Sequence, residues 1–407
     1  MNRQEQIHRL LSRLRAGEPA GELDEFGLLR PQGVAARTRL NEVVTASAER
    51  GPQAERLAIW LLGPFGGAKS NTLLLMAAGL RGLGRGKFLS AVTRVDLKQG
   101  REASTPQGLQ AALFYNLAFI GAGRLGDKVT AWVAPLQERA QRRGDAGANV
   151  LGLGVDVAIG LAGLTLPGVT GLAGKVVTWG SRKLALRKGK LRQRIRALGL
   201  NDPEAEEFML SWVAYSLGPS DGTWAQFRRM TETLAASGRL FPVACRMLEK
   251  VGYSSVTLFL DECDLLIGNQ PLTGALESIR AAGTEGRHEL DLFFVMAGVD
   301  RISELANVQD YRGFVRRFIS AEDGPVLQEQ LSQPVLDGSA GDDLSRVIGV
   351  LGGLSPDAPA HLQQSLRISQ EAATRIRTRL QHVKEPTWSK FWTAVFAEID
   401  SSPPGPT

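Results

Sequence analysis

Hydrophobic and polar positions follow two different periods along this chain. Short continuous apolar runs, each bounded by turn residues, occupy residues 57–62, 88–96, 256–260 and 290–296. Such runs are typical of strands buried in a parallel sheet. Helical spacing of apolar residues is found between them, at 4–16, 36–49, 70–83, 105–142, 203–217 and 223–250. Strands that alternate with helices predict an α/β fold with a parallel sheet.

The C-terminal part of the chain is predicted to be mostly helical. Residues 301–397 carry helical patterns interrupted by Gly and Pro, and residues 368–380 are the best patterned among them. Residues 398–407 end in a run of Ser, Pro and Gly, which predicts a disordered tail.

Composition narrows the class of protein. The chain has 407 residues, of which 43% are hydrophobic and 22% charged, so fibrous and wholly disordered chains are excluded. The net charge of +6 is compatible with nucleic acid or an anionic membrane surface. Two cysteines and four scattered histidines exclude a disulfide framework and a Cys/His zinc site. The first residues are charged throughout, unlike a secretory signal, so we expect a cytoplasmic protein.

The run that ends at residue 62 leads directly into a candidate phosphate-binding loop. Residues 63–70, GPFGGAKS, fit the pattern G-x-x-x-x-G-K-[ST] except that Ala68 replaces the last Gly. Such a loop wraps backbone N–H groups round a phosphate, and the following helix directs its N-terminal dipole at the same anion. Lys69 is then expected to bridge the β- and γ-phosphates of ATP, and the Ser70 hydroxyl to bind Mg²⁺. The alternative is a Gly-rich turn that happens to contain Lys-Ser. The predicted nucleotide-binding residues are Gly63, Pro64, Phe65, Gly66, Gly67, Ala68, Lys69, Ser70 and Asn71.

A pair of carboxylates follows the third apolar run. Residues 256–260 lead into Asp261-Glu262, which has the form of a Walker B strand. Asp261 is then predicted to lie in the second coordination shell of the metal, and Glu262 to polarise the water that attacks the γ-phosphate. Taken alone, these two residues would indicate only a solvated strand end. Cys263 is expected to be a small packed residue behind the site.

The order of these segments resembles a known superfamily. GPFGGAKSN, VTLFLDECD and LDLFFVMAG follow one another as in the AAA+ ATPases, in the branch of replication initiators and STAND-type proteins. Two further segments, LLSRLRAGEPAGELDEFGLL and CRMLEKVGYSSVTLFLDECDLL, look like ATPases from BREX phage-defence operons. The resemblance covers about residues 1–100 and 240–335.

The resemblance implies an architecture: a P-loop NTPase core of the AAA+ type with a parallel sheet, a large helical insertion and a C-terminal helical lid. The implied segments are a helical lead-in at 1–50, the ATPase core at 51–320 with a Gly-rich and basic insertion at about 105–250, a helical lid at 321–397, and the tail. Members of the superfamily assemble as oligomers, so a homo-oligomer is implied as well.

Three further site positions are implied by the resemblance. The strand after Walker B ends with a polar sensor in the family, and here Asp300 is the candidate because Ala297 and Gly298 are not polar. Arg316 or Arg317 matches the arginine finger that reaches a neighbour's γ-phosphate, and the alternative for both is a solvated helix face. The lid lacks the family's sensor Arg, for which Lys384 is the candidate substitute.

The insertion is the compositional outlier. Residues 157–174 contain no charge, and a cluster without acidic residues follows. Three interpretations stay open for this stretch: a membrane-inserting segment with a basic flank, a contact with nucleic acid, or a helical hairpin packed on protein. In the nucleic-acid interpretation, Leu184, Leu186, Leu191 and Ile195 form a buried stripe and the cations track a phosphate backbone without reading bases. The basic cluster comprises Arg182, Lys183, Arg187, Lys188, Lys190, Arg192, Arg194 and Arg196.

Taken together, these patterns predict an ATPase that binds ATP and Mg²⁺ and assembles on DNA as a loader or switch, in phage defence and with partner proteins encoded nearby. A nucleotide-gated scaffold without useful turnover is the alternative. A membrane-associated NTPase is the third and least favoured possibility.

Overall fold

The computed structural model describes most of the chain outside the insertion. The described residues are 3–16, 23, 26, 28–53, 56–80, 83, 87–95, 104–120, 128, 131–132, 191–193, 195–197, 202–217, 220–282, 290–299, 311–322, 324–337, 342–352, 368–383 and 386–401. Residues 157–174, most of the basic cluster, Asp300 and Lys384 lie outside the described residues.

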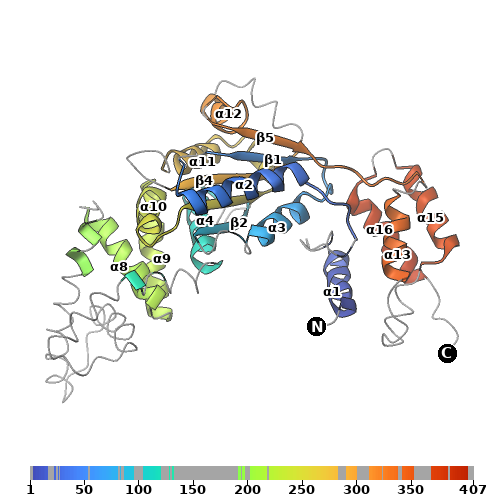
Figure 1. Ribbon diagram of the computed structural model, residues 1–407, viewed down its shortest axis with the longest axis horizontal. Coiled ribbons are helices and arrows are strands. Elements are labelled where there is room, and N and C mark those ends of the chain that lie inside the picture. Colours follow the sequence, from blue (N-terminus) through green and yellow to red (C-terminus); the bar gives the residue numbers. More distant parts are fainter. Residues whose placement is uncertain are drawn as a thin grey trace, which may run out of the picture.

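The centre of the molecule is a five-stranded sheet in which every pairing is parallel (Figure 1). The strand order is β2-β3-β4-β1-β5. The bounds are Ala58–Leu62 for β1, Phe88–Arg94 for β2, Ser255–Asp261 for β3, Asp291–Gly298 for β4 and Val326–Gln330 for β5. The predicted α/β fold with a parallel sheet is therefore confirmed, and the four apolar runs form β1 to β4.

Both faces of the sheet are covered, which explains why the central strands read as continuous apolar runs. In β4 every residue is buried. Phe293, Val295 and Ala297 contribute to the core on one face, and Phe294 and Met296 to the core on the other. A parallel strand that is buried on both sides needs apolar side chains at every position, not at alternate ones.

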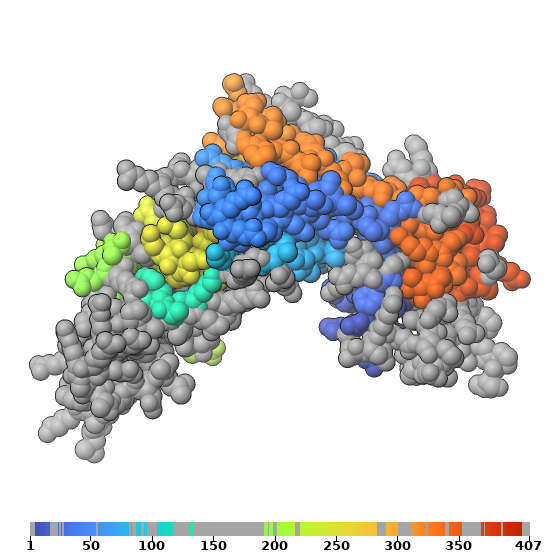
Figure 2. Space-filling model, in the orientation of Figure 1, coloured from blue at the N-terminus to red at the C-terminus, as the bar shows by residue number. Residues whose placement is uncertain are grey.

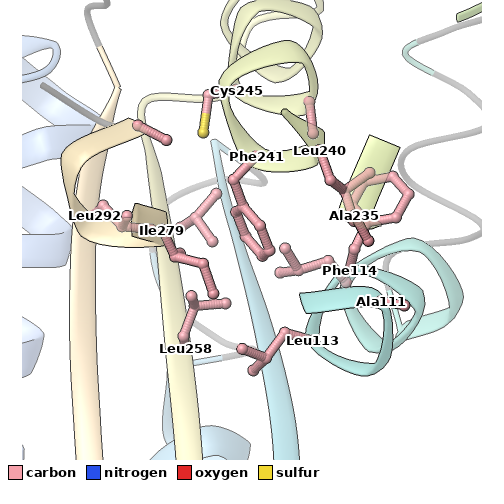
Figure 3. Close-up of a cluster of buried hydrophobic side chains, with 14 of the residues drawn as sticks. Ala111, Leu113, Phe114, Ala235, Leu240, Phe241, Cys245, Leu258, Ile279 and Leu292 are labelled. Atoms are coloured by element: carbon pink, nitrogen blue, oxygen red, sulfur yellow. The ribbon is translucent and has the colours of Figure 1, made fainter. Parts of the chain in front are cut away.

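The helices divide between the two faces. The first face is covered by α2 (Val34–Arg50) and α3 (Lys69–Leu80). The second is covered by α4 (Pro106–Ile120), α10 (Leu240–Lys250), α11 (Gln270–Ala282) and α12 (Arg312–Phe318), with α8 (Pro203–Leu217) and α9 (Asp221–Ala236) packed beyond α4. Figure 3 shows side chains of α4, α10 and α11 converging on Leu258 and Leu292 of the sheet.

Two predicted elements differ from the structure. The pattern at 223–250 predicted one helix, but Gly238, with φ +69°, interrupts it between α9 and α10. Residues 326–330 were predicted to be helical and instead form β5. This strand lies at the edge of the sheet and is only partly buried, so its sequence, VLQEQ, carries few of the apolar residues that mark β1 to β4.

A second hydrophobic core lies beside the sheet. It joins α1 (Arg3–Arg15) to α13 (Asp343–Gly352), α15 (Gln370–Gln381) and α16 (Trp388–Ser401), and we call these four helices the helical module. Arg15 pairs with Asp400 at 2.9 Å and lies over the ring of Phe396. Residues from the two ends of the sequence thus share one core, and in Figure 2 blue residues lie directly against the orange ones.

Within the part of the chain that the structure describes, no helix is long and apolar enough to cross a membrane. The uncharged segment 157–174 is not part of that search, so the membrane interpretation stays a prediction.

Candidate functional site

The candidate phosphate-binding loop connects β1 to α3. Gly66, with φ +79°, and Ala68, with φ +64°, both adopt the left-handed conformation, and α3 begins at Lys69. The Gly67 N–H donates to the Pro64 carbonyl at 3.0 Å and closes a tight turn. The strand, loop and helix therefore follow each other as the sequence predicted.

Ala68 explains why the motif has Gly at this position. An L-residue in the left-handed region costs about 1–2 kcal/mol, which Gly avoids. Here the Ala68 methyl group belongs to the core of the helical module. Burial of that methyl group offsets part of the strain, since a buried carbon of this size contributes about 0.8 kcal/mol.

Lys69 is folded over its own loop. Its ammonium group donates to the Gly63 and Pro64 carbonyls, each at 2.8 Å. These contacts hold a positive charge above the backbone of the loop, where the N-terminal end of α3 adds the partial positive charge of the helix dipole. The loop therefore carries positive charge from Lys69 and from the start of α3.

The sheet topology places this loop at a switch point. The connection from β1 to β2 runs through α3 on one face, whereas the connection from β4 to β5 runs through α12 on the other. Right-handed crossovers that move in opposite directions along a sheet must lie on opposite faces. In open α/β sheets, ligands bind outside the carboxyl ends of the strands at such a reversal.

Asp261 and Glu262 lie at the same edge of the sheet. Asp261 is the last residue of β3, and by alternation with Phe259 its side chain is on the face that α3 covers. Its Oδ1 accepts the Glu262 N–H at 2.9 Å. Glu262 has φ +56°, which is a strained conformation for a residue with a long side chain. Strain of this kind is characteristic of functional sites.

The register of the strands relates the two halves of the site. Leu61 of β1 is paired with Ala297 of β4, and Leu260 of β3 with Met296. Asp261 and Leu61 therefore flank Ala297 in one row, about 10 Å apart at two strand spacings. The loop, the start of α3 and the carboxylates lie at one edge and on one face, with no large side chain of β4 between them.

The helical module contacts the loop directly. The Ser389 N–H, in the first turn of α16, donates to the Gly66 carbonyl at 3.1 Å. A methyl group placed on Gly66 would lie 2.8 Å from Ser389 Cβ and 3.1 Å from Thr387 Oγ1. Gly66 is thus required both for its backbone angle and for the close approach of α16. Sequence reasoning missed Thr387 and Ser389, and the paired glycines were the one signal that something packs closely there.

The predicted arginine-finger residues are bound within their own chain. Arg316 pairs with Glu322 at 3.0 Å, and Arg317 with Glu277 of α11 at 2.7 Å. Burial raises the pKa of Glu277, although the adjacent guanidinium opposes this shift. Both arginines lie on α12, on the face of the sheet opposite α3. If either of these two arginines contacts a phosphate at the loop, that loop would have to belong to a neighbouring subunit.

Two members of the basic cluster are described, and both are paired with acidic residues. Arg192 lies 3.1 Å from Glu206 and 3.5 Å from Glu207, and Arg196 lies 2.6 Å from Glu206. Leu191 and Ile195 are buried, as predicted for the apolar stripe of this segment. The carboxylates of α8 offset part of the positive charge at this end of the cluster.

The two thiols are packed residues. Burial raises the pKa of Cys263 well above its ordinary value and that of Cys245 to about 12, so neither forms a reactive thiolate near neutral pH. Cys263 donates to the Leu260 carbonyl at 3.3 Å, as expected for a small residue behind the site. Among the described residues, no group of three or more His, Cys, Asp or Glu could hold a metal ion.

Comparisons with known proteins do not assign a family. No protein-family model matches the chain, and no curated protein matches it. The function is therefore argued from the geometry of the site.

Proposed function

We propose that the protein binds ATP with Mg²⁺ at the loop of residues 63–71 and hydrolyses it, as an AAA+-like P-loop ATPase. The observation that carries the proposal is the position of Lys69-Ser70. These residues open α3 directly after a buried strand, at the switch point of a parallel sheet, and Asp261-Glu262 end a second strand on the same face. A Gly-rich turn with an incidental Lys-Ser would not require carboxylates at the same place.

The residues divide the work between binding and chemistry. Lys69 and the first turn of α3 bind the phosphates, because both carry positive charge at the loop. The oxygens of Ser70 and Asp261 are the ligand type that Mg²⁺ prefers. The metal, when bound, neutralises negative charge on the transferring phosphoryl group. Glu262 accepts a proton from the attacking water, which leaves ADP and phosphate as products.

Titration of the purified protein with ATP tests this proposal. We expect saturable binding of ATP in Mg²⁺ that weakens when the metal is removed with a chelator, because Ser70 and Asp261 then lose the cation that links them to the phosphates. The absence of binding with and without Mg²⁺, measured by calorimetry at several salt concentrations, would contradict the assignment of the loop.

A scaffold that binds nucleotide without useful turnover is the second candidate. It is supported by Ala297 and Gly298, which occupy the end of β4 beside Asp261 and offer no polar side chain. The strained Ala68 supports it too, because the loop has less conformational freedom than a Gly would allow. The hydrolysis rate separates this candidate from the ATPase.

Assembly on DNA is the second part of the proposal. The basic cluster contains eight cations and no acidic residue within its sequence, which supports a contact with phosphates that does not depend on base sequence. A homo-oligomer is supported by α12, since its arginines lie away from the loop of their own chain. A loader or switch in phage defence, with partners encoded nearby, fits an ATPase of this architecture. A place on the membrane is the least supported possibility.

Replacement of four cations tests the DNA contact. Arg187, Lys188, Lys190 and Arg192 are changed together to Gln, and DNA binding is measured over a series of salt concentrations. The plot of log affinity against log salt should flatten by a slope of roughly 0.7–0.9 for each lost phosphate contact. Arg192 should contribute least, because Glu206 and Glu207 already offset its charge.

The control for this experiment is the Arg228→Gln variant. Arg228 is about as exposed as Arg192 and lies on α9, where it pairs with Glu232 at 2.8 Å. Its loss should leave the salt dependence unchanged. If the fourfold variant keeps the affinity and slope of the parent protein, the basic cluster is not the DNA contact.

A further inference from the structure

The segment that follows β5 carries a buried amide without a partner. Among the described residues, Gln333 has both its Nε2 and its Oε1 buried, and neither atom has a hydrogen-bond partner. A buried polar group that makes no hydrogen bond is destabilising, so its retention needs an explanation.

The backbone on both sides of Gln333 is firmly held. The Ser332 N–H donates to Gln32 Oε1 at 2.9 Å, and the Ser332 carbonyl accepts from Trp388 Nε1, also at 2.9 Å. Two residues later, the Val335 N–H donates to Asp343 Oδ2 at 2.8 Å. The amide of Gln333 is therefore presented by a rigid segment, and its position is not a consequence of a loose chain.

The amide borders the phosphate-binding loop. A methyl group placed on Gly67 would lie 3.5 Å from Gln333 Nε2 and 2.9 Å from the Pro64 carbonyl oxygen. The amide nitrogen and this carbonyl oxygen thus border the same small space. The Pro64 carbonyl already accepts two hydrogen bonds, from the Gly67 N–H at 3.0 Å and from Lys69 Nζ at 2.8 Å.

Binding of a phosphate would compete for these two donors. The Lys69 ammonium and the N–H groups of the loop are the groups that a phosphate anion attracts. When they turn to the anion, the carbonyl of the half-buried Pro64 loses both of its partners, which is destabilising. A replacement donor must then be close by.

We propose that Gln333 is a positioning residue of the loop, whose Nε2 donates to the Pro64 carbonyl when Lys69 and the Gly67 N–H turn to a bound phosphate. The proposal rests on the proposed nucleotide binding at residues 63–71. The loop thus has two hydrogen-bonded arrangements. In the nucleotide-free arrangement the Gln333 amide makes no hydrogen bond, and in the phosphate-bound arrangement it donates to the Pro64 carbonyl.

The Gln333→Leu variant tests the proposal by two readouts of opposite sign. Leu is close to Gln in size and carries no polar group, so the nucleotide-free protein should gain stability, with a melting temperature higher by roughly 2–4 °C. The affinity for ATP with Mg²⁺ should nevertheless fall by roughly five- to tenfold, because the Pro64 carbonyl is left without a donor. A residue with a purely structural role would lower stability when replaced.

The matched control is Gln32→Leu. Gln32 is also buried and contacts the residue before Gln333, but its amide is satisfied, since its Nε2 donates to Ser332 Oγ at 2.8 Å and its Oε1 accepts the Ser332 N–H. This variant should lose stability. If Gln333→Leu lowers the melting temperature, or binds ATP as the parent protein does, the role proposed for Gln333 is wrong while nucleotide binding stands. If the parent protein binds no ATP, both proposals fail.

Discussion

Replacement of Glu262 by Gln is expected to reduce ATP hydrolysis by about two to four orders of magnitude while ATP binding persists. The amide of Gln has nearly the same size as the carboxylate and can still hydrogen-bond to water, but it cannot accept a proton. The backbone at this position has φ +56°, and the substitution leaves that strain unchanged. Phosphate release under single-turnover conditions, together with ATP affinity from calorimetry, measures both quantities.

The Asp264→Asn variant is the control for Glu262. Asp264 lies two residues away in the short helix Cys263–Leu266, so its replacement removes one negative charge from the same region without removing the proposed base. Its effect on hydrolysis should be small. A Glu262→Gln variant that hydrolyses ATP at the parent rate would refute the role of Glu262. A parent protein without turnover above background, with or without DNA, would establish the scaffold.

The second large effect is expected from Lys69→Ala, which should weaken ATP binding by roughly ten- to hundredfold. The change removes a charge-assisted hydrogen bond to the phosphates, and such bonds contribute about 1.5–3 kcal/mol. Calorimetric titration with ATP and Mg²⁺ measures the loss. ADP binding should fall as well, because the loop cradles the β-phosphate.

A lysine at the other end of the sheet provides the control for Lys69. Lys87, just before β2, also donates its ammonium group to a backbone carbonyl, that of Ala48 at 2.9 Å. Lys87→Ala therefore removes the same side chain and the same kind of bond, and ATP affinity should not change. Equal affinities of the Lys69→Ala variant and the parent protein would remove the basis for nucleotide binding at the loop.

The sheet could be predicted from the sequence where burial leaves a strong signal. The runs that form β1 to β4 are apolar at consecutive positions because helices cover both faces. The edge strand β5 carries no such run, since one of its sides meets no strand and none of its residues is fully buried. The break at Gly238 was missed for a different reason: apolar residues at helical spacing continue on both sides of it.

The candidate site could be predicted only as far as it is local in sequence. The loop and α3 are contiguous, and Asp261-Glu262 are adjacent, so each half has a recognisable spacing. Gln333 and Ser389 reach the loop through the packing of β5 and α16, and no periodicity links residues so far apart in the chain. Likewise, nothing in the basic cluster indicated that Glu206 would pair with Arg192 and Arg196.

The shared core of α1 and α16 has a consequence for synthesis on the ribosome. Leu11 is made long before Trp388, and both belong to the core of the helical module. At about 5–20 residues per second, roughly 20–75 s separate the two. For most of this interval the apolar side of α1, with Ile7 and Leu10, lacks the helices α13, α15 and α16 that complete its core. The buried side of α1 therefore depends on residues made much later, and we expect it to be exposed on the nascent chain until α13, α15 and α16 have been made.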